Sequence, residues 1–139
     1  MSRAAQLFAA SLLALACAHP LDADPSIDPG IVDVRSAGSW EDGDLSGTYR
    51  VVVRHYGFEE ISSSIIFEWV AGDTRESPAH LIHSVVFADA LLGSVGINSL
   101  RSTDGGVEVV LVGTLHNGSP YRCLVVLHPG GTFSKGRGC

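Results

Sequence analysis

The sequence predicts an all-β protein: a single antiparallel meander of about six strands that folds as a small sandwich or a partly closed barrel. Three observations support this. The apolar residues fall into strand-length runs rich in β-branched and aromatic types, several runs alternate with a period of two, and short glycine-rich turns join them without a helical pattern between. The 139 residues amount to one domain.

The two strands that alternate most clearly come first. One is expected to begin at Thr48, and one of its faces carries Tyr49, Val51, Val53 and His55. A turn over residues 57–60 leads to the next strand, residues 61–70, whose large apolar side chains share a face: Ile61, Ile65, Phe67 and Trp69. Both are therefore predicted to be half-buried strands.

The later strands are expected over residues 81–88, 97–103, 107–115 and 121–128. The third of these is apolar on both faces, which predicts a central position in a sheet. After it, the pair Asn117-Gly118 predicts a two-residue type I′ hairpin turn. That turn would pair Val112 with Cys123 across the hairpin.

Residues 1–18 have the layout of an export signal. Arg3 supplies a positive start, and residues 7–16 form an uncharged, largely apolar stretch. This stretch is too short to span a bilayer stably, and Pro20 follows it. The sequence therefore predicts a signal that is removed during export.

The segment Leu13-Ala14-Leu15-Ala16-Cys17 resembles the lipobox of bacterial lipoproteins. The resemblance implies that the signal is cut before Cys17, that Cys17 is acylated as a lipid anchor, and that the protein is an outer-membrane lipoprotein facing the periplasm. An alternative stays open: cleavage after Ala16 or Ala18 as an ordinary small-residue site would give a soluble periplasmic or secreted protein.

An acidic segment follows over residues 19–46, rich in proline, glycine and aspartate. It carries seven acidic residues and one basic residue, whereas residues 47–139 carry eight and seven. We expect a flexible tether of about 25 residues here, with Ile31, Val32 and Trp40 able to dock on a β domain over residues 47–139. The absence of a basic patch argues against nucleic acid as a partner.

The two cysteines beyond the signal, Cys123 and Cys139, are predicted to form a disulfide, since an exported chain with an even pair normally oxidises it. Such a loop is worth about 3 kcal/mol by the chain-entropy estimate. The bond would tie the glycine-rich tail, residues 130–138, to the sheet.

The sequence contains no convincing catalytic constellation, and no metal or cofactor is expected. On a strand, His80 and His83 are expected to point to opposite faces, because their spacing is odd. An enzyme would need a cleft that brings His55, His116 or His128 to a carboxylate.

The stretch Ser46-Gly47-Thr48-Tyr49 resembles the S-G-x-Y motif of bacterial periplasmic lysozyme inhibitors, which are small β proteins often carried as lipoproteins. The resemblance covers these four residues only. It implies that Ser46 and Tyr49 belong to an inhibitory loop and that a lysozyme-like enzyme is the partner.

These features favour an envelope-anchored protein-binding module, such as an inhibitor, an immunity-type protein or an accessory lipoprotein. It would bind an envelope or secreted protein through strand edges and hairpin tips, which include Phe58 and Asn117. One alternative is a periplasmic carrier of a small hydrophobic ligand, with an interior lined by Val51, Val53, Phe67 and Trp69. The other is an enzyme of unrecognised type.

Overall fold

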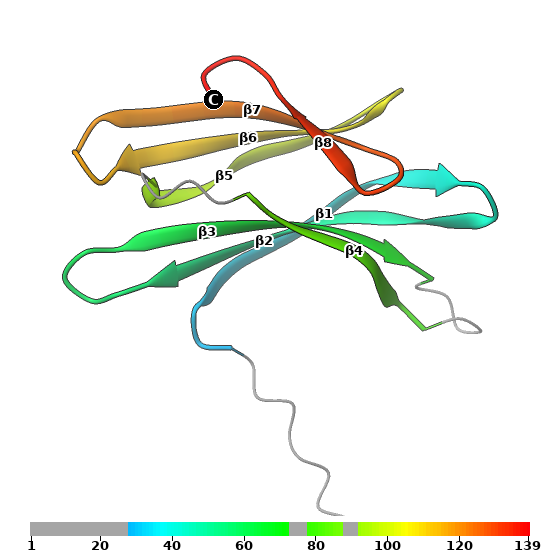
Figure 1. Cartoon of the computed structure of the whole chain (residues 1–139), viewed down its shortest axis with the longest axis horizontal. Coiled ribbons are helices and arrows are strands. Elements are labelled where there is room, and N and C mark those ends of the chain that lie inside the picture. The colour runs from blue at the N-terminus through cyan, green and yellow to red at the C-terminus, as the bar shows by residue number, and fades with distance from the viewer. Residues whose placement is uncertain (1–27, 73–77, 88–91) are drawn as a thin grey trace, which may run out of the picture.

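The computed structural model describes residues 28–72, 78–87 and 92–139. These residues form two four-stranded antiparallel sheets that lie one over the other (Figure 1). The first sheet contains, in order, β1 (Ile31–Asp42), β2 (Leu45–Tyr56), β3 (Ser62–Ala71) and β4 (His80–Phe87). The second contains β5 (Leu92–Thr103), β6 (Gly106–Leu115), β7 (Pro120–His128) and β8 (Thr132–Lys135). The predicted signal and Cys17 lie outside the described residues.

The predicted all-β antiparallel architecture is confirmed, and of the two expected forms it is the sandwich. Within each sheet, strands that follow one another in the sequence are neighbours and pair antiparallel. The strand apolar on both faces, β6, lies between β5 and β7 as expected. No helix able to cross a membrane is found in the part of the chain that the structure describes.

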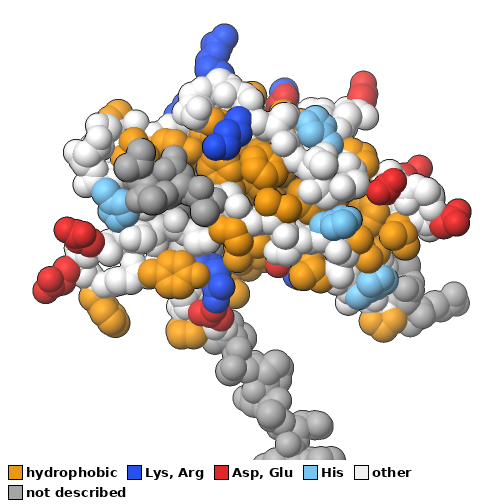
Figure 2. All heavy atoms as spheres, viewed as in Figure 1, with side chains coloured by type: hydrophobic (Ala, Val, Ile, Leu, Met, Phe, Trp, Pro, Cys, Tyr) orange, Lys and Arg blue, Asp and Glu red, His pale blue; other side chains and the backbone are white. Residues whose placement is uncertain are grey.

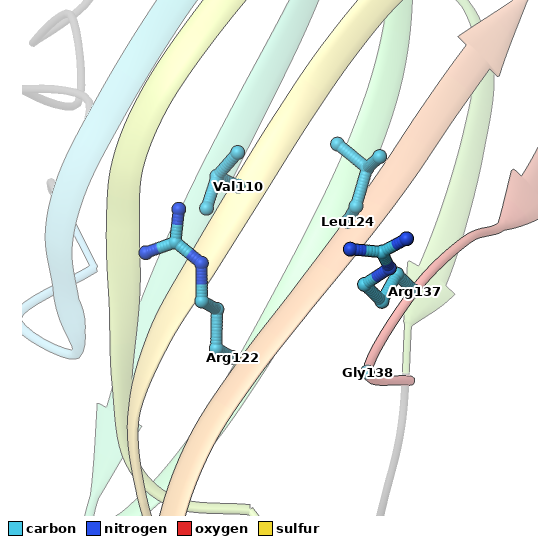
Figure 3. Close-up of a pocket in the computed structure, with 5 residues that line it drawn as sticks. All are labelled: Val110, Arg122, Leu124, Arg137 and Gly138. Carbon is cyan, nitrogen blue, oxygen red and sulfur yellow. The ribbon is translucent and has the colours of Figure 1, made fainter.

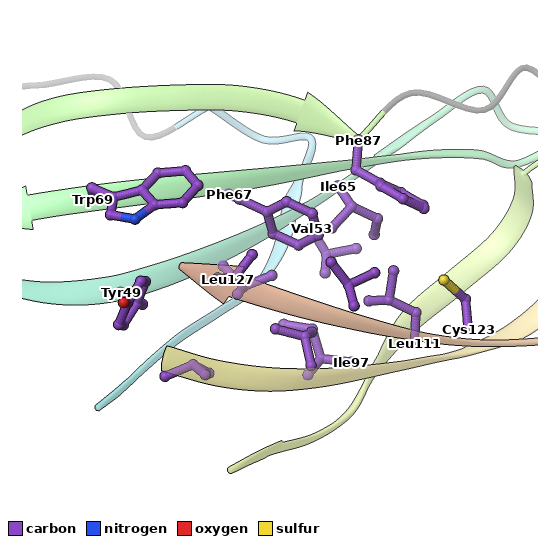
Figure 4. Packing of buried hydrophobic residues seen from close by; sticks show 14 of the residues in the cluster. Tyr49, Val53, Ile65, Phe67, Trp69, Phe87, Ile97, Leu111, Cys123 and Leu127 are labelled. Atoms are coloured by element: carbon purple, nitrogen blue, oxygen red, sulfur yellow. The ribbon is translucent and has the colours of Figure 1, made fainter. Parts of the chain in front are cut away.

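The core lies between the facing sides of the two sheets (Figure 4). The predicted inner face of β2 is confirmed, because Tyr49, Val51 and Val53 are fully buried. In the second sheet, alternate residues of β6 and β7 meet them: Val107, Val109, Leu111, Cys123, Val125 and Leu127. Burial of these faces on each other supplies the main stabilising free energy of the sandwich.

Polar side chains on the inner face of the first sheet form hydrogen bonds with the backbone of the second. Ser63 Oγ donates to the Gly93 carbonyl oxygen at 2.6 Å and accepts from the Val95 amide at 2.8 Å. At the other end of β3, Trp69 Nε1 donates to the His128 carbonyl oxygen at 2.7 Å. Since hydrophobic contact alone is non-directional, these bonds fix how the sheets lie on each other.

The tether predicted over residues 19–46 is wrong where the structure describes strand β1. This strand pairs with β2 along its length, and Trp40 is buried and donates its indole N–H to the Thr48 carbonyl oxygen at 3.0 Å. Shifts in register between Ile31 and Asp33 and between Ala37 and Trp40 interrupt the alternation. A strand with such bulges lacks the period-two pattern by which strands are found in a sequence.

The C-terminal tail contains β8, a four-residue strand that the sequence analysis did not expect. Its Phe133 packs against Phe67 and Phe87 of the first sheet, with ring centroids 5.3 and 5.9 Å away. Cys123 and Cys139 are disulfide-bonded in the structure, with their Cα atoms 4.6 Å apart. The predicted disulfide thus holds the end of the tail on β7.

The hairpin between β6 and β7 differs from its prediction by one residue. Val112 pairs with Arg122, and Leu111 pairs with Cys123. The Leu115 amide donates to the Ser119 carbonyl oxygen at 2.9 Å, so the loop has three residues rather than two. Gly118 has a φ of 81°, the conformation that a turn closed by a glycine bulge requires. This register puts Leu111 and Cys123 together in the core, as their burial demands.

We predict that Ser63→Ala lowers the free energy of unfolding by about 1–3 kcal/mol, because a buried carbonyl and a buried amide lose their partner. Chemical denaturation measures this change. Ser64→Ala is the matched control: Ser64 lies on the outer face of the same strand, and its substitution should change stability by less than about 0.5 kcal/mol. Equal losses in the two variants would contradict a bridging role for Ser63.

Candidate functional site

Two hairpin connections lie side by side at one end of the sandwich: residues 57–61 between β2 and β3, and residues 116–119 between β6 and β7 (Figure 1). Ser62 Oγ and His116 Nε2 are 3.2 Å apart and join the hairpins. Between them lies a cleft of about 300 Å³ whose lining includes Glu59, Glu60, Ile61 and His116. We call this end the two-hairpin surface; its members are Phe58, Glu59, Glu60, Ile61, His116 and Asn117.

The local structure of each hairpin explains why these side chains are exposed. Phe58, at the tip of the first hairpin, is fully exposed, and Ile61 beside it is 41% exposed. In the second hairpin Asn117 Oδ1 accepts a hydrogen bond from the Ser119 amide at 2.9 Å, which stabilises the turn. The structure therefore brings Phe58 and Asn117, both predicted binding residues, to the same end of the molecule.

The two-hairpin surface combines apolar and acidic groups. Acidic, hydrophobic and histidine side chains gather at this end of the molecule (Figure 2). Glu59 and Glu60 are both exposed, and neither forms an ion pair with a described residue. An exposed aromatic ring next to unpaired carboxylates is suited to a partner with an apolar pocket rimmed by positive charge.

The contact between Ser62 and His116 could be one half of a nucleophile and base arrangement. Activation of a hydroxyl also needs a third group that orients the imidazole. Glu59 and Glu60 line the same cleft, but neither is hydrogen-bonded to His116 within the described ranges. What the geometry shows is a contact that holds the two hairpins together.

The structure separates Ser46 from Tyr49 in a way that contradicts an inhibitory loop. Both lie in β2, where Ser46 is exposed next to the β1–β2 turn. Tyr49 is fully buried, and its ring packs edge-on against Trp69 with centroids 6.1 Å apart (Figure 4). The implied place of Tyr49 in an inhibitory loop is therefore wrong, because its side chain is part of the core.

The interior expected for a hydrophobic-ligand carrier is filled by side chains. Val51, Val53, Phe67 and Trp69 are all fully buried and belong to one cluster with residues of the opposite sheet. Phe67, for example, lies 5.7 Å from Phe87 and 5.3 Å from Phe133, measured between ring centroids. These four residues pack a core and do not line an open cavity, so the expectation based on them is wrong.

The expectation that His80 and His83 face opposite ways is also wrong. A bulge in β4 pairs His83 with Trp69 and His80 with Ala71, and both of these partners are buried on the inner face of β3. The extra residue in the bulge thus returns the two histidines to the same side of the sheet. No group of three metal-ligating side chains occurs among residues 28–72, 78–87 and 92–139.

No family model, no curated protein and no solved structure matches this chain. The significance of the two-hairpin surface therefore rests on the exposure, charge and position of its own residues.

Tyr49 provides a test of its core position, because its hydroxyl is buried without a hydrogen-bond partner in the structure. Tyr49→Phe should leave the protein at least as stable at neutral pH, since it removes an unsatisfied polar atom. Tyr49→Ala should lower the free energy of unfolding by about 3–5 kcal/mol.

Wild type and Tyr49→Phe can also be compared as a function of pH. Burial raises the pKa of the Tyr49 hydroxyl above its usual 10.0. Above that pH the unfolded chain releases this proton while the folded chain keeps it, so the free energy of unfolding falls. The stability of wild type relative to Tyr49→Phe should therefore decline in denaturation experiments from about pH 9 to about pH 11. Parallel pH curves for the two proteins would show that Tyr49 is accessible to water.

Proposed function

We propose that this protein is an exported, envelope-anchored protein-binding module that contacts its partner through the two-hairpin surface. The observation that carries the proposal is Phe58, a fully exposed aromatic side chain at a hairpin tip. Aromatic side chains contribute much of the binding free energy of protein interfaces. They do so by burying a large apolar area, which in Phe58 is still in contact with water. Phe58 therefore has the chemistry of an interface anchor.

Rigidity of the surrounding structure supports the same proposal. The contact between Ser62 and His116 joins the hairpin that carries Phe58 to the second hairpin. The next residue, Ser63, is hydrogen-bonded to the backbone of β5. A binding surface held in one arrangement loses less conformational entropy when a partner binds. The acidic pair Glu59 and Glu60 would favour a basic rim on the partner and speed its approach.

Because β1 belongs to the sandwich, only the residues before it could serve as a tether. Asp28 is already tied to the sandwich by its ion pair with Arg54 of β2, and it lies 11 positions after Cys17, the proposed lipid anchor. A fully extended chain of this length spans at most about 40 Å. A lipid-anchored form would therefore hold the sandwich close to the membrane, where it would meet partners in the same envelope layer.

A lysozyme-like enzyme remains one candidate partner, but it would have to be bound by a surface other than Ser46 and Tyr49. The two-hairpin surface lies at the far end of β2 from Ser46, ten residues or about 33 Å of strand away. The proposal therefore takes the exposed anchor Phe58, and not the four-residue resemblance, as the site of contact.

The binding test compares Phe58→Ala with Leu45→Ala. Leu45 is 46% exposed in the hairpin at the opposite end of β2, which makes it a matched apolar control. Envelope extract and a panel of lysozymes are passed over each immobilised protein, and the affinity of any retained partner is measured. Phe58→Ala should weaken binding by about 30-fold, as expected for an interface anchor, and Leu45→Ala should leave it unchanged.

Two outcomes would contradict the proposal. One is a specific partner that binds Phe58→Ala as tightly as wild type. The other is the absence of any stoichiometric partner for the wild-type protein in an extract of its own envelope.

A further inference from the structure

The outer face of the second sheet carries a cleft lined by basic and apolar residues, whereas the lining of the cleft at the two-hairpin surface includes acidic ones. The cleft measures about 500 Å³ and is lined by Val110, Arg122, Leu124, Arg137 and Gly138 (Figure 3). Val110 of β6 and Leu124 of β7 are paired neighbours and form an apolar floor. Arg122 extends from β7 across β6 on one side of this floor, and Arg137 lies beside Leu124 on the other (Figure 3).

The disulfide and the backbone place Arg137 next to β7. The Leu124 amide donates to the Arg137 carbonyl oxygen at 3.1 Å, and the Gly136 amide donates to the Leu124 carbonyl oxygen at 2.7 Å. Two residues further on, Cys139 is bonded to Cys123. Between them Gly138 passes so close to the Arg122 backbone that any side chain would collide with its carbonyl oxygen. The tail thus holds a second arginine beside the first.

These two arginines differ from every other arginine that the structure describes. Arg35, Arg50, Arg54 and Arg101 each form an ion pair, with Asp33, Glu68, Asp28 and Glu108 respectively. Arg122 and Arg137 have no carboxylate within ion-pair distance among the described residues. Two neighbouring cations without a counter-charge repel each other, and an anion between them would relieve that repulsion.

The wider charge distribution favours the same kind of ligand. Residues 92–139, which form the second sheet and its tail, carry four basic and two acidic side chains. Residues 28–71 of the first sheet carry three basic and eight acidic side chains. The second sheet and its tail therefore carry a net positive charge, which favours an anion over a cation as the ligand of the cleft.

We propose that the cleft between Arg122 and Arg137 binds a small organic anion, in which a phosphate or carboxylate group is attached to a short hydrocarbon portion. The planar guanidinium groups would hold the oxyanion through paired N–H···O hydrogen bonds. The hydrocarbon portion would lie on Val110 and Leu124 and remove their outer surfaces from water. This ligand site is separate from the proposed partner surface, so either can fail without the other.

The test is a titration of the oxidised protein with hexyl phosphate, followed by backbone amide chemical shifts. The amides of Val110, Leu124 and Arg137 should shift together and saturate. Arg122→Gln and Arg137→Gln should each weaken binding by at least about tenfold, as the loss of a charge-assisted hydrogen bond predicts. Arg101→Gln, on the same sheet but paired with Glu108, should change the affinity by less than about twofold.

Control ligands separate the two parts of the proposed site. Hexanol and inorganic phosphate should each bind at least about tenfold more weakly than hexyl phosphate, since each lacks one part of the recognised chemistry. Vesicles of anionic phospholipid should bind no better than neutral vesicles. Retention on anionic vesicles that depends on both arginines would assign the site to a lipid headgroup and overturn the proposal of a soluble ligand.

Three further results would also overturn the proposal: no binding of hexyl phosphate, unchanged binding to the double variant Arg122→Gln/Arg137→Gln, or an equal loss in Arg101→Gln. Phe58→Ala serves as an independent control and should leave this titration unchanged, whatever its effect on a protein partner.

Discussion

The sandwich depends on hydrogen bonds between polar side-chain groups on the inner face of β3 and the backbone of the second sheet. Ser63 and Trp69 lie six residues apart on this strand, about 20 Å, and both form hydrogen bonds to the backbone of the opposite layer. Two fixed points at this separation prevent the layers from sliding or rotating. Everything built on both sheets follows from this constraint, including the approach of the β2–β3 hairpin to the β6–β7 hairpin.

Periodicity predicted the middle of the fold well because burial on one face repeats every second residue. It identified the buried faces of β2 and β3, and it also placed Tyr49 with Val51 and Val53. It failed where extra residues interrupt the repeat. The bulges of β1 concealed a whole strand, and the bulge of β4 turned His80 and His83 to the same side. Bulge positions are set by pairing with a neighbour, which a single strand's sequence does not contain.

The candidate surfaces show the same division between local and long-range information. The exposure of Phe58 and Asn117 follows from their turns and could be anticipated. Their proximity depends on a contact between Ser62 and His116, 54 residues apart, which arises only when the two sheets pack. Tyr49 shows the converse, because its alternation with buried valines was stronger information about its environment than a four-residue resemblance. The presence of Arg122 and Arg137 on one cleft was not predicted, because it depends on the path of the tail along β7 as well as on the disulfide.

The disulfide has a second consequence beyond its stabilisation of the tail. Strand β8 has only four residues, and terminal segments of this kind open locally more readily than central strands do unless they are tied down. Cys123 is fully buried, so the bond connects the outer tail to the core itself. This gives the last residues the rigidity of the sheet and keeps Arg137 at a constant position relative to Arg122. Electrostatic interactions are screened over about 8 Å at physiological salt, so two guanidinium groups act on one anion only if both lie within such a distance of it. The covalent bond thus supplies the condition under which two exposed arginines become a single site.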